Sequence, residues 1–174
     1  MDFKKKNKIG ILGGSFDPAH KGHLAISKEA AKKFKIKKII WAITNKNPLK
    51  KKSSFNLSTR IKLCKSIIKK TKTIQVKFYE KKIKSNKTIN LINLFAKNKK
   101  NEIYFIMGAD NLINFHKWHR WKEISKKCNI IVFDRHGYKK KSLNSKTYKS
   151  LNKEKLKFIN FNKVNISSSQ LRKI

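Results

Sequence analysis

The stretch Lys8-Ile-Gly-Ile-Leu-Gly-Gly-Ser-Phe-Asp-Pro-Ala-His-Lys-Gly-His23 decides the fold of this chain. Its apolar run, Ile9 to Leu12, predicts a buried β-strand that ends at the glycine pair and cannot continue through Pro18. From Gly22 onward, apolar residues recur with helical spacing. A strand, a glycine turn and a helix in this order direct free backbone N–H groups at an anion, with the positive end of the helix dipole behind them.

Two histidines, His20 and His23, stand at the entrance of this predicted helix and can add two side-chain donors on one side. A glycine turn alone occurs in many α/β proteins that bind no phosphate, and a single histidine is usually structural. Two histidines that flank Gly22 directly after such a turn are harder to explain by packing. The stretch therefore predicts a nucleotide triphosphate site, although it matches neither the dinucleotide nor the Walker-type glycine fingerprint.

The whole chain, residues 1–174, is predicted to form one domain, because its length suffices for a sizeable core. No apolar run approaches the roughly 18 residues of a membrane span. The residues after Met1 lack the apolar region of a signal peptide, so we expect a cytoplasmic protein. Cys64 and Cys128 lie in apolar periodic segments without metal-ligand spacing. They are predicted to be buried thiols, with a disulfide between them left open as an alternative.

The net charge of +37, from 46 basic and 9 acidic residues, is the strongest feature of the composition. Such a charge favours contact with nucleic acids or acidic membranes. However, the lysines are spread over the whole length, and lysine reads bases less well than arginine. Only four of the basic residues are arginines: Arg60, Arg120, Arg135 and Arg172. We therefore expect a solvated lysine surface with no specific nucleic-acid partner and with nonspecific polyanion binding at low salt.

Strand and helix patterns alternate along the chain, which predicts an α/β fold with a Rossmann-like, doubly wound and mostly parallel sheet. Strands are predicted over 9–12, 37–43, 73–78, 103–107, 129–133 and 156–161. Helices are predicted from Gly22, over 57–69 with Ser58 as a possible cap, over 88–96 and from Ser167, with a broken helical stretch after Asp110. Segments 80–87 and 134–153 are predicted to be loops. Ligands of such sheets bind outside the carboxyl ends of the strands, where the motifs of this chain fall.

The last motif is Asn165-Ile-Ser-Ser-Ser-Gln-Leu-Arg172. Its three serines offer caps and hydroxyl donors where a helix begins, and the first turn of that helix exposes N–H groups. Arg172 can bring a guanidinium fork to a phosphate. The motif therefore predicts a second anion pocket.

These motifs resemble those of a known superfamily. The first stretch closely resembles the G-x-F-x-P-x-H-x-G-H signature of the nucleotidyltransferases, and the last motif resembles their I-S-S-T-x-I-R element. The segment from Met107 to Ile124 resembles the G-A-D…F-x-x-W-x-x-W-x-x-I segment of bacterial nicotinate-nucleotide adenylyltransferases. Residues 41–50 with Arg60, residues 87–91 and residues 134–138 resemble further blocks of that family. The resemblance covers nearly the whole chain, and the combination of blocks is specific.

The resemblance implies a role for each matched residue. Trp118 is expected to stack on the pyridine ring, whereas Trp121 is expected to belong to the core. Backbone N–H groups near Thr88 and His119 are expected to receive the nicotinate carboxylate, and the side chains of His116, His119 and His136 are expected at the surface. The implied catalytic residues are His20, His23 and Arg172. The implied ATP and phosphate ligands are Gly13, Gly14, Ser15, Phe16, Gly108, Asp110, Ser167 and Ser168. The implied ligands of nicotinate mononucleotide are Thr88, Trp118, His119, Arg135 and Lys50.

The resemblance also implies a reaction: transfer of the adenylyl group of ATP to nicotinate mononucleotide, which gives nicotinate adenine dinucleotide and pyrophosphate. Mg²⁺ is expected to be held mainly by the ATP phosphates, with no metal-ligand cluster in the protein. The oligomeric state and the degree of preference for the acid over the amide mononucleotide stay open.

Two alternatives compete with this reading. One is another adenylyltransferase of the superfamily, such as the pantetheine-phosphate enzyme, which usually has Thr where His20 stands and lacks the Trp118–Trp121 block. The other is a noncatalytic, basic nucleic-acid-binding domain. It would explain the charge but would leave both anion motifs without a purpose.

Overall fold

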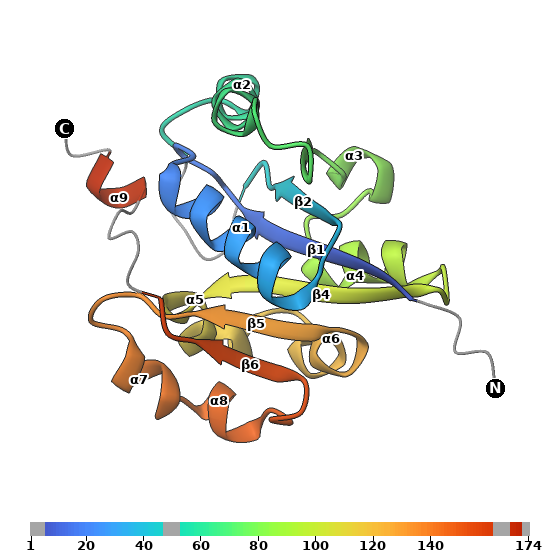
Figure 1. The fold of residues 1–174 in the computed structure, drawn as a ribbon, viewed down its shortest axis with the longest axis vertical. Helices are drawn as coiled ribbons and strands as arrows, with labels where there is room; N and C mark the ends of the chain where they lie inside the picture. The colour runs from blue at the N-terminus through green and yellow to red at the C-terminus, as the bar shows by residue number, and fades with distance from the viewer. Residues whose placement is uncertain (1–5, 47–52, 162–167, 172–174) are drawn as a thin grey trace.

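A six-stranded, all-parallel sheet in the order β3-β2-β1-β4-β5-β6 forms the centre of the computed structural model (Figure 1), which describes residues 6–46, 53–161 and 168–171. The chain reverses direction across the sheet between β1 and β4, which is the switch point of a doubly wound fold. This confirms the predicted Rossmann-like sheet. The strands are β1 (Asn7–Gly14), β2 (Lys38–Ile43), β3 (Ile74–Lys77), β4 (Asn101–Gly108), β5 (Asn129–Phe133) and β6 (Leu156–Ile159).

Helices cover both faces of this sheet, as the ribbon in Figure 1 shows. The two longest are α1 and α2, and each begins close to its predicted start. The helices are α1 (Lys21–Phe34), α2 (Leu57–Ile68), α3 (Glu80–Ile83), α4 (Thr88–Ala96), α5 (Ala109–Asn114), α6 (Trp121–Lys127), α7 (Lys139–Leu143), α8 (Lys146–Ser150) and α9 (Ser168–Leu171), with a 3₁₀ turn, η1 (Phe115–Lys117), between α5 and α6.

The strands bury both faces, because side chains alternate between two apolar layers. Ile11, Ile40 and Phe105 belong to the layer covered by α4, α5 and α6. Their neighbours Leu12 and Trp41 belong to the layer covered by α1 and α2. In β4, residues Ile103 to Met107 are all buried, which confirms the prediction of a central strand. Helices therefore cover most of both faces of the described sheet, and space for a ligand is left near the carboxyl ends of its strands.

The predicted loops at 80–87 and 134–153 are wrong in part, because they contain the short helices α3, α7 and α8. Their lysine-rich sequences show little apolar periodicity, so the helical signal is weak. A few tertiary contacts and helix caps stabilise these short helices instead. Ile83 packs against the core from α3, and Thr147 is fully buried in α8. Ser145 caps α8 by accepting a hydrogen bond from the Tyr148 N–H at 3.1 Å.

The predicted N-terminal cap of α2, Ser58, is wrong. Asn56 caps this helix by accepting a hydrogen bond from the Thr59 N–H at 2.8 Å, so the predicted cap Ser58 lies inside the helix. Asparagine is at least as good a cap as serine, and its side chain satisfies one of the unpaired N–H groups of the first turn.

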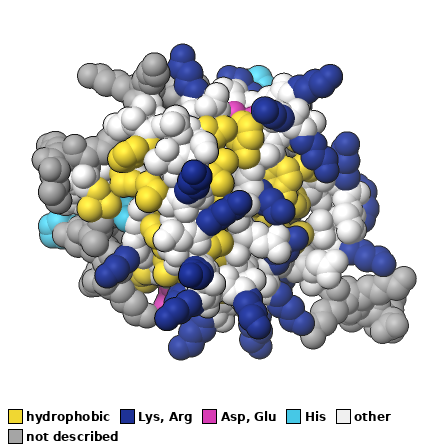
Figure 2. Space-filling model, turned by 90° about the horizontal axis from the view of Figure 1, so that it is seen from above, with side chains coloured by type: hydrophobic (Ala, Val, Ile, Leu, Met, Phe, Trp, Pro, Cys, Tyr) yellow, Lys and Arg dark blue, Asp and Glu magenta, His cyan; other side chains and the backbone are white. Residues whose placement is uncertain are grey.

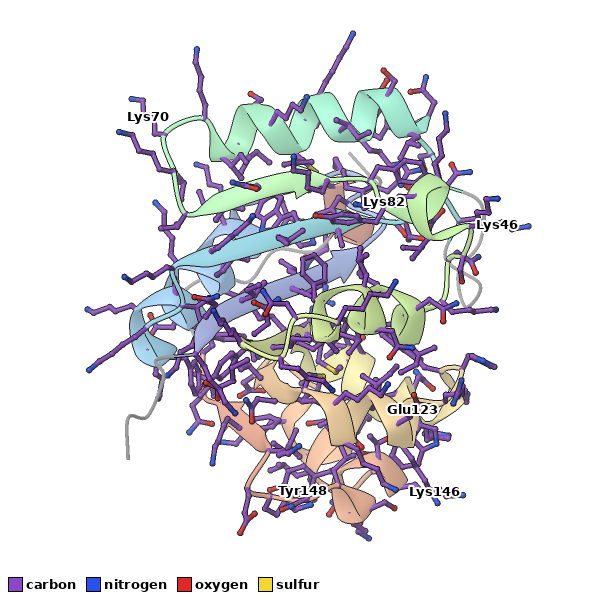
Figure 3. All side chains as sticks on the ribbon, turned by 90° about the vertical axis from the view of Figure 1, so that its right-hand side faces the viewer. Lys46, Lys70, Lys82, Glu123, Lys146 and Tyr148 are labelled. Atoms are coloured by element: carbon purple, nitrogen blue, oxygen red, sulfur yellow. The ribbon has the colours of Figure 1, made fainter. Side chains whose placement is uncertain are left out.

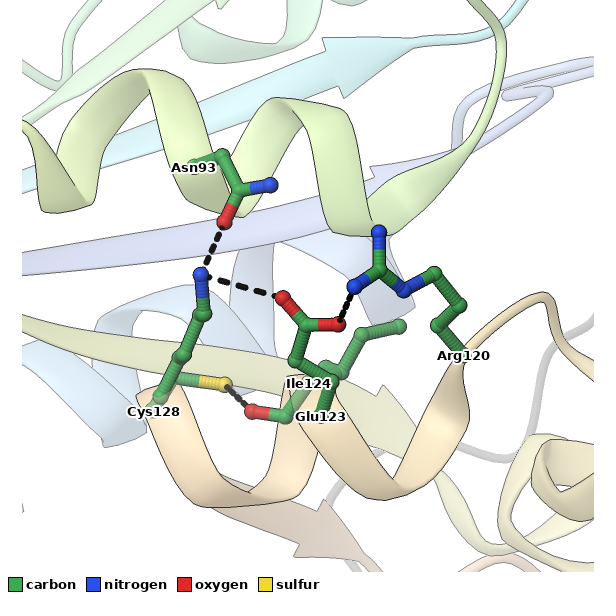
Figure 4. A network of polar contacts seen from close by, with 6 residues as sticks. Asn93, Arg120, Glu123, Ile124 and Cys128 are labelled. Carbon is green, nitrogen blue, oxygen red and sulfur yellow. Dashed lines mark hydrogen bonds and ion pairs between the residues drawn. The ribbon is translucent and has the colours of Figure 1, made fainter.

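Polar contacts on α6 connect it to α4 (Figure 4). The Lys127 ammonium bridges the Glu123 carboxylate, at 3.1 Å, and the Asn93 side-chain oxygen of α4, at 2.6 Å. Glu123 also pairs with Arg120 at 2.5 Å, and these contacts lower the Glu123 pKa. The network lies on the surface, so its main effect is to fix the relative position of the two helices.

Both cysteines are free and buried, as predicted. Burial raises the pKa of each thiol to about 12, so neither is a thiolate at neutral pH. The Cys128 Sγ–H donates to the Ile124 carbonyl in its own helical turn (Figure 4). Among the helices of the described part of the chain, none is long and apolar enough to cross a membrane.

One buried hydrogen-bond chain connects α1 to β2. The Trp41 indole N–H donates to the Ser27 hydroxyl at 2.9 Å, and that hydroxyl donates to the His23 carbonyl at 2.8 Å. Trp41 and Ser27 are both fully buried. The chain therefore fixes the first turn of α1 against the sheet.

We expect Ser27→Ala to lower the free energy of unfolding by about 1–3 kcal/mol, because it leaves the buried Trp41 N–H without an acceptor. Ser150→Ala is the matched control, since the Ser150 hydroxyl also donates to a carbonyl four residues earlier but is exposed. Urea denaturation of both variants measures the difference. Equal losses in the two variants would contradict this account.

Candidate active site

The loop after β1 turns sharply at Phe16, whose φ of 48° places it in the left-handed region. The Phe16 ring is 2 % exposed and stacks on Trp41, with ring centroids 5.1 Å apart. An aromatic anchor in the core thus holds the turn in a conformation that is costly for a non-glycine residue. Of the predicted phosphate ligands, Phe16 can therefore offer its backbone, while its side chain supports the loop.

His20 and His23 form the N-terminal cap of α1. The Nδ1 atom of His20 accepts from the Gly22 N–H at 3.1 Å, and the Nδ1 atom of His23 accepts from the His20 N–H at 3.2 Å. An Nδ1 atom that accepts carries no proton, so each neutral ring has its proton on Nε2. Burial, together with the charge of Arg135, lowers the His20 pKa to about 4. The rings are 3.8 Å apart between centroids.

A cavity of about 350 Å³ opens beside this loop, at the carboxyl ends of β1, β2 and β4. Its lining brings together predicted residues that are far apart in the sequence: Gly13, Gly14, Ser15, Thr88, Trp118 and His119. The structure thus places the first loop and three of the five predicted mononucleotide residues around one space, while Arg135 does not line it.

Trp118 and Trp121 are both partly buried against the same core cluster. Trp118 is half-buried and lines the cavity, where edge-on contacts with Phe105 and Phe115 hold its ring. Trp121 packs against the core and touches Phe115 at a centroid distance of 6.1 Å. Trp118 is therefore the tryptophan of the pair that lines the cavity.

The far wall of the cavity carries polar groups from α3 and α4. Thr88 is the first residue of α4, and the first N–H groups of a helix have no acceptor within it. The Glu80 carboxylate accepts from the Thr44 hydroxyl and from the Asn45 N–H, the latter at 3.2 Å. Glu80 lines the cavity but was not predicted as a site residue, because its segment has no recognisable motif.

Asp110 and Arg135 meet at a polar edge next to the cavity. Their side chains form an ion pair at 2.6 Å, and the Arg135 guanidinium lies 5.8 Å from the Tyr138 ring. Gly108 allows this approach, since a Cβ there would lie 2.5 Å from the Asp110 carboxylate. The sequence pointed to both charged residues but not to their pairing. Asp110 follows β4 and Arg135 follows β5, so the adjacent strands bring them together.

The last helix lies against the first loop. The Ser168 hydroxyl donates to the Pro18 carbonyl at 2.8 Å, across 150 positions of sequence. Figure 1 shows α9 beside the beginning of α1. The described part of the second motif, residues 168–171, therefore contacts the loop of the first motif. Of the other predicted site residues, Lys50, Ser167 and Arg172 lie outside the described residues.

Two buried charged residues near this edge were not predicted as site residues. Asp17 accepts from the Ser54 and Phe55 N–H groups at 2.7 and 2.9 Å. Arg60 is 1 % exposed and donates to backbone carbonyls around the cavity. A signal for Arg60 existed, because it stands four residues before Cys64, on the apolar face of α2.

Comparison with known proteins agrees with this geometry. The family model of the cytidylyltransferase-like proteins matches residues 11–174. A protein of Pelagibacter ubique, described as a probable nicotinate-nucleotide adenylyltransferase, is 68% identical over 171 residues, which are 98% of this chain and 95% of that protein. A protein of Aliarcobacter butzleri with the same description is 36% identical over 83% of this chain and 80% of its own length.

Among solved structures, the fold resembles that of Plasmodium falciparum nicotinic acid mononucleotide adenylyltransferase complexed with APC. The TM-score is 0.76 at 23% identity, over 96% of this chain and 83% of that one. The same enzyme complexed with NaAD gives a TM-score of 0.75. Because the family model covers almost the whole chain and the curated relatives align over most of their length, the chain belongs to the cytidylyltransferase-like family and, within it, to the nicotinate-nucleotide adenylyltransferases.

Proposed function

We propose that this chain transfers the adenylyl group of ATP to nicotinate mononucleotide, and that residues 1–174 form one nucleotidyltransferase domain. The observation that carries the proposal is that the loop after β1 lines the aromatic-containing cavity at one end and contacts the last helix at the other. Ser15 lines the cavity, and Pro18, in the same loop, contacts the last helix. A loop that serves both the cavity and the last helix suits a reaction that brings the phosphates of two nucleotides together.

The cavity is proposed to hold nicotinate mononucleotide. Trp118 offers a ring face for the pyridine, and backbone N–H groups near Thr88 and His119 suit its carboxylate. Lys50 is proposed to assist at the same nucleotide. Gly13, Gly14 and Ser15 line the cavity as well, and their backbone is proposed to lie beside the nucleotide phosphates.

The polar edge is proposed to hold ATP. The Nε2–H groups of His20 and His23 suit phosphate oxygens, and Ser167, Ser168 and Arg172 are proposed to hold the β- and γ-phosphates. Gly108 and Asp110 are proposed at the ribose, and the backbone of Phe16 at the phosphates. Arg135, which Asp110 holds at this edge, is proposed to reach the mononucleotide phosphate.

The chemistry follows from the substrates. The mononucleotide phosphate is already an anion, so it needs no general base to attack the α-phosphorus of ATP. As the new phosphoanhydride bond forms, the bond from the α-phosphorus to pyrophosphate breaks, and pyrophosphate leaves with the electron pair. The protein aligns two polyanions and neutralises the charge that moves to the leaving group. No covalent enzyme intermediate is needed, although Ser15 lies close by.

Mg²⁺ is proposed to arrive as part of the ATP complex, held by phosphate oxygens and water. Within residues 6–46, 53–161 and 168–171, no group of three or more His, Cys, Asp or Glu side chains could hold a metal ion. The Asp110 carboxylate at the polar edge is engaged by Arg135. The described residues therefore offer no cage of their own, and the proposed steps use protein groups alone.

The lysine surface supports this proposal over nucleic-acid recognition. Lysine side chains are spread over the face shown in Figure 2, with apolar side chains between them. In Figure 3, Lys46, Lys70, Lys82 and Lys146 extend from elements at opposite ends of the molecule. A dedicated nucleic-acid face would gather such charges in one stripe. The buried free thiols fit the proposed cytoplasmic location.

We expect the purified protein to release pyrophosphate from ATP with nicotinate mononucleotide and to form nicotinate adenine dinucleotide. Nicotinamide mononucleotide and phosphopantetheine, offered separately, measure the specificity. Turnover with phosphopantetheine alone would support the other superfamily enzyme. No pyrophosphate with any acceptor, together with tight binding of DNA or RNA at physiological salt, would support the basic binding domain.

We expect His23→Asn to lower kcat on the order of 10²–10³-fold, because Asn can keep the acceptor at the Nδ1 position but lacks the Nε2–H donor. Steady-state turnover with both substrates measures the effect, and circular dichroism verifies the fold. His116→Gln is the control, since the His116 ring contacts Thr147 in α8 and has no proposed role. Equal kcat for His23→Asn and the wild type would remove His23 from its role.

We expect the free energy of unfolding to rise with pH between about 4 and 6.5, the folded and ordinary pKa values of His20. In this range the unfolded chain binds a proton at His20 that the folded chain does not, so stability increases with pH and levels off above it. His20→Asn can keep the cap acceptor without titrating, so its stability should depend less steeply on pH. Urea denaturation at several pH values measures both slopes, and identical slopes would contradict the assignment.

A further inference from the structure

Arg60 of α2 points its guanidinium at four backbone carbonyls. Its Nη1 donates to Ser15 and Thr44, each at 2.7 Å, its Nη2 to Asn45 at 3.0 Å, and its Nε to Phe55 at 3.0 Å. The side chain is 1 % exposed. Burying a cation is expensive unless other groups replace its hydration, and here the carbonyl oxygens do so.

These carbonyls belong to three separate segments: the loop after β1, the loop after β2 and the start of α2. Two of the residues, Ser15 and Thr44, line the cavity. The Thr44 N–H also donates to the Gly14 carbonyl at 2.9 Å, which joins the first two loops directly. A guanidinium with five donors can hydrogen-bond to three segments at once, whereas a lysine ammonium has only three donors for the four oxygens.

The contacts also set the direction of the peptide groups. In a trans peptide, the C=O of one residue and the N–H of the next point in opposite directions. The Thr44 carbonyl faces Arg60, and the Asn45 N–H correspondingly donates to Glu80. By the same geometry, the Ser15 carbonyl faces Arg60, so the Phe16 N–H points away from the guanidinium.

A second buried group holds the third segment from its other side. The Phe55 N–H donates to the Asp17 carboxylate at 2.9 Å, while the Phe55 carbonyl accepts from Arg60. Asp17 stands in the loop after β1, so this loop and the start of α2 are tied by two independent contacts. The contacts of Asp17 and Arg60 therefore hold the loop after β1 in one conformation without a bound ligand.

We propose that Arg60 is a positioning residue for substrate binding, which preorganises the β1 and β2 loops and places a buried positive charge behind the peptides that face the substrate phosphates. Its charge polarises these peptides and strengthens their N–H groups as donors to an anion. This inference rests on the proposed adenylyltransferase function. Contacts of this kind hold the bound substrates and the transition state alike, so their loss should raise KM and leave kcat nearly unchanged.

Hydrogen exchange of the wild-type protein without substrates tests the preorganisation. The amide N–H groups of Thr44, Ser54 and Phe55, which donate hydrogen bonds to the first loop, should exchange as slowly as those of β1, within about tenfold. Exchange of these N–H groups that is orders of magnitude faster than that of β1 would overturn the proposal. This measurement needs neither a variant nor a working substrate.

Kinetics of Arg60→Lys test the role in binding. In the folded variant, KM for nicotinate mononucleotide and for ATP should rise on the order of ten- to a hundredfold, with kcat nearly unchanged. Lys62→Gln is the matched control, because it removes a cation from an exposed position of the same helix, and its KM values should equal those of the wild type. A merely structural Arg60 would lower the melting temperature and leave KM unchanged, which would overturn the proposal.

The outcomes separate the two proposals. A wild-type protein without turnover overturns the adenylyltransferase function, and hydrogen exchange then still decides whether the loops are preorganised. A wild-type protein with turnover, beside a folded Arg60→Lys variant with unchanged KM, overturns the positioning role alone. If Arg60→Lys does not fold, the exchange measurement decides.

Discussion

The burial of both faces of the parallel sheet is the constraint on which the rest of this molecule depends. Because β1, β2, β4 and β5 pack apolar side chains above and below, polar groups that bind a ligand are left with the carboxyl edge of the sheet. The cavity, the histidine cap, the Asp110–Arg135 pair and the contact of Ser168 with Pro18 all lie there. Because the chain reverses direction between β1 and β4, the loops after these strands diverge and leave a crevice at this edge.

Several groups at the edge serve the fold and the proposed chemistry together. The imidazoles of His20 and His23 complete the first turn of α1 through Nδ1, which leaves the proton on Nε2. Phe16 anchors a strained turn in the core, and the same turn presents backbone to the cavity side. Local stability and ligand geometry are therefore determined by the same atoms, and a substitution at this edge acts on both.

Much of this arrangement could be predicted from the sequence, because it depends on local patterns. The strand, turn and helix from Ile9 onward and the apolar run of β4 carry strong periodic signals. Helices α7 and α8 were missed, since they have few apolar residues and depend on single buried side chains such as Thr147. The four carbonyls around Arg60, and the ion pair of Asp110 with Arg135, come together only through long-range packing. No local pattern records which distant backbone atoms a buried guanidinium will meet.

The scarcity of acidic residues has an electrical consequence. Four of the nine, Asp17, Glu80, Asp110 and Asp134, stand at the carboxyl edge, where they accept hydrogen bonds from backbone or from Thr44 and Arg135. Even with all nine carboxylates ionised, they cannot balance 46 basic side chains. Dissolved anions must balance the remaining positive charge. In solution the protein therefore diffuses together with an atmosphere of small counterions. Its effective charge, and the reach of its attraction for nucleotides, is therefore set by the surrounding electrolyte as much as by the chain.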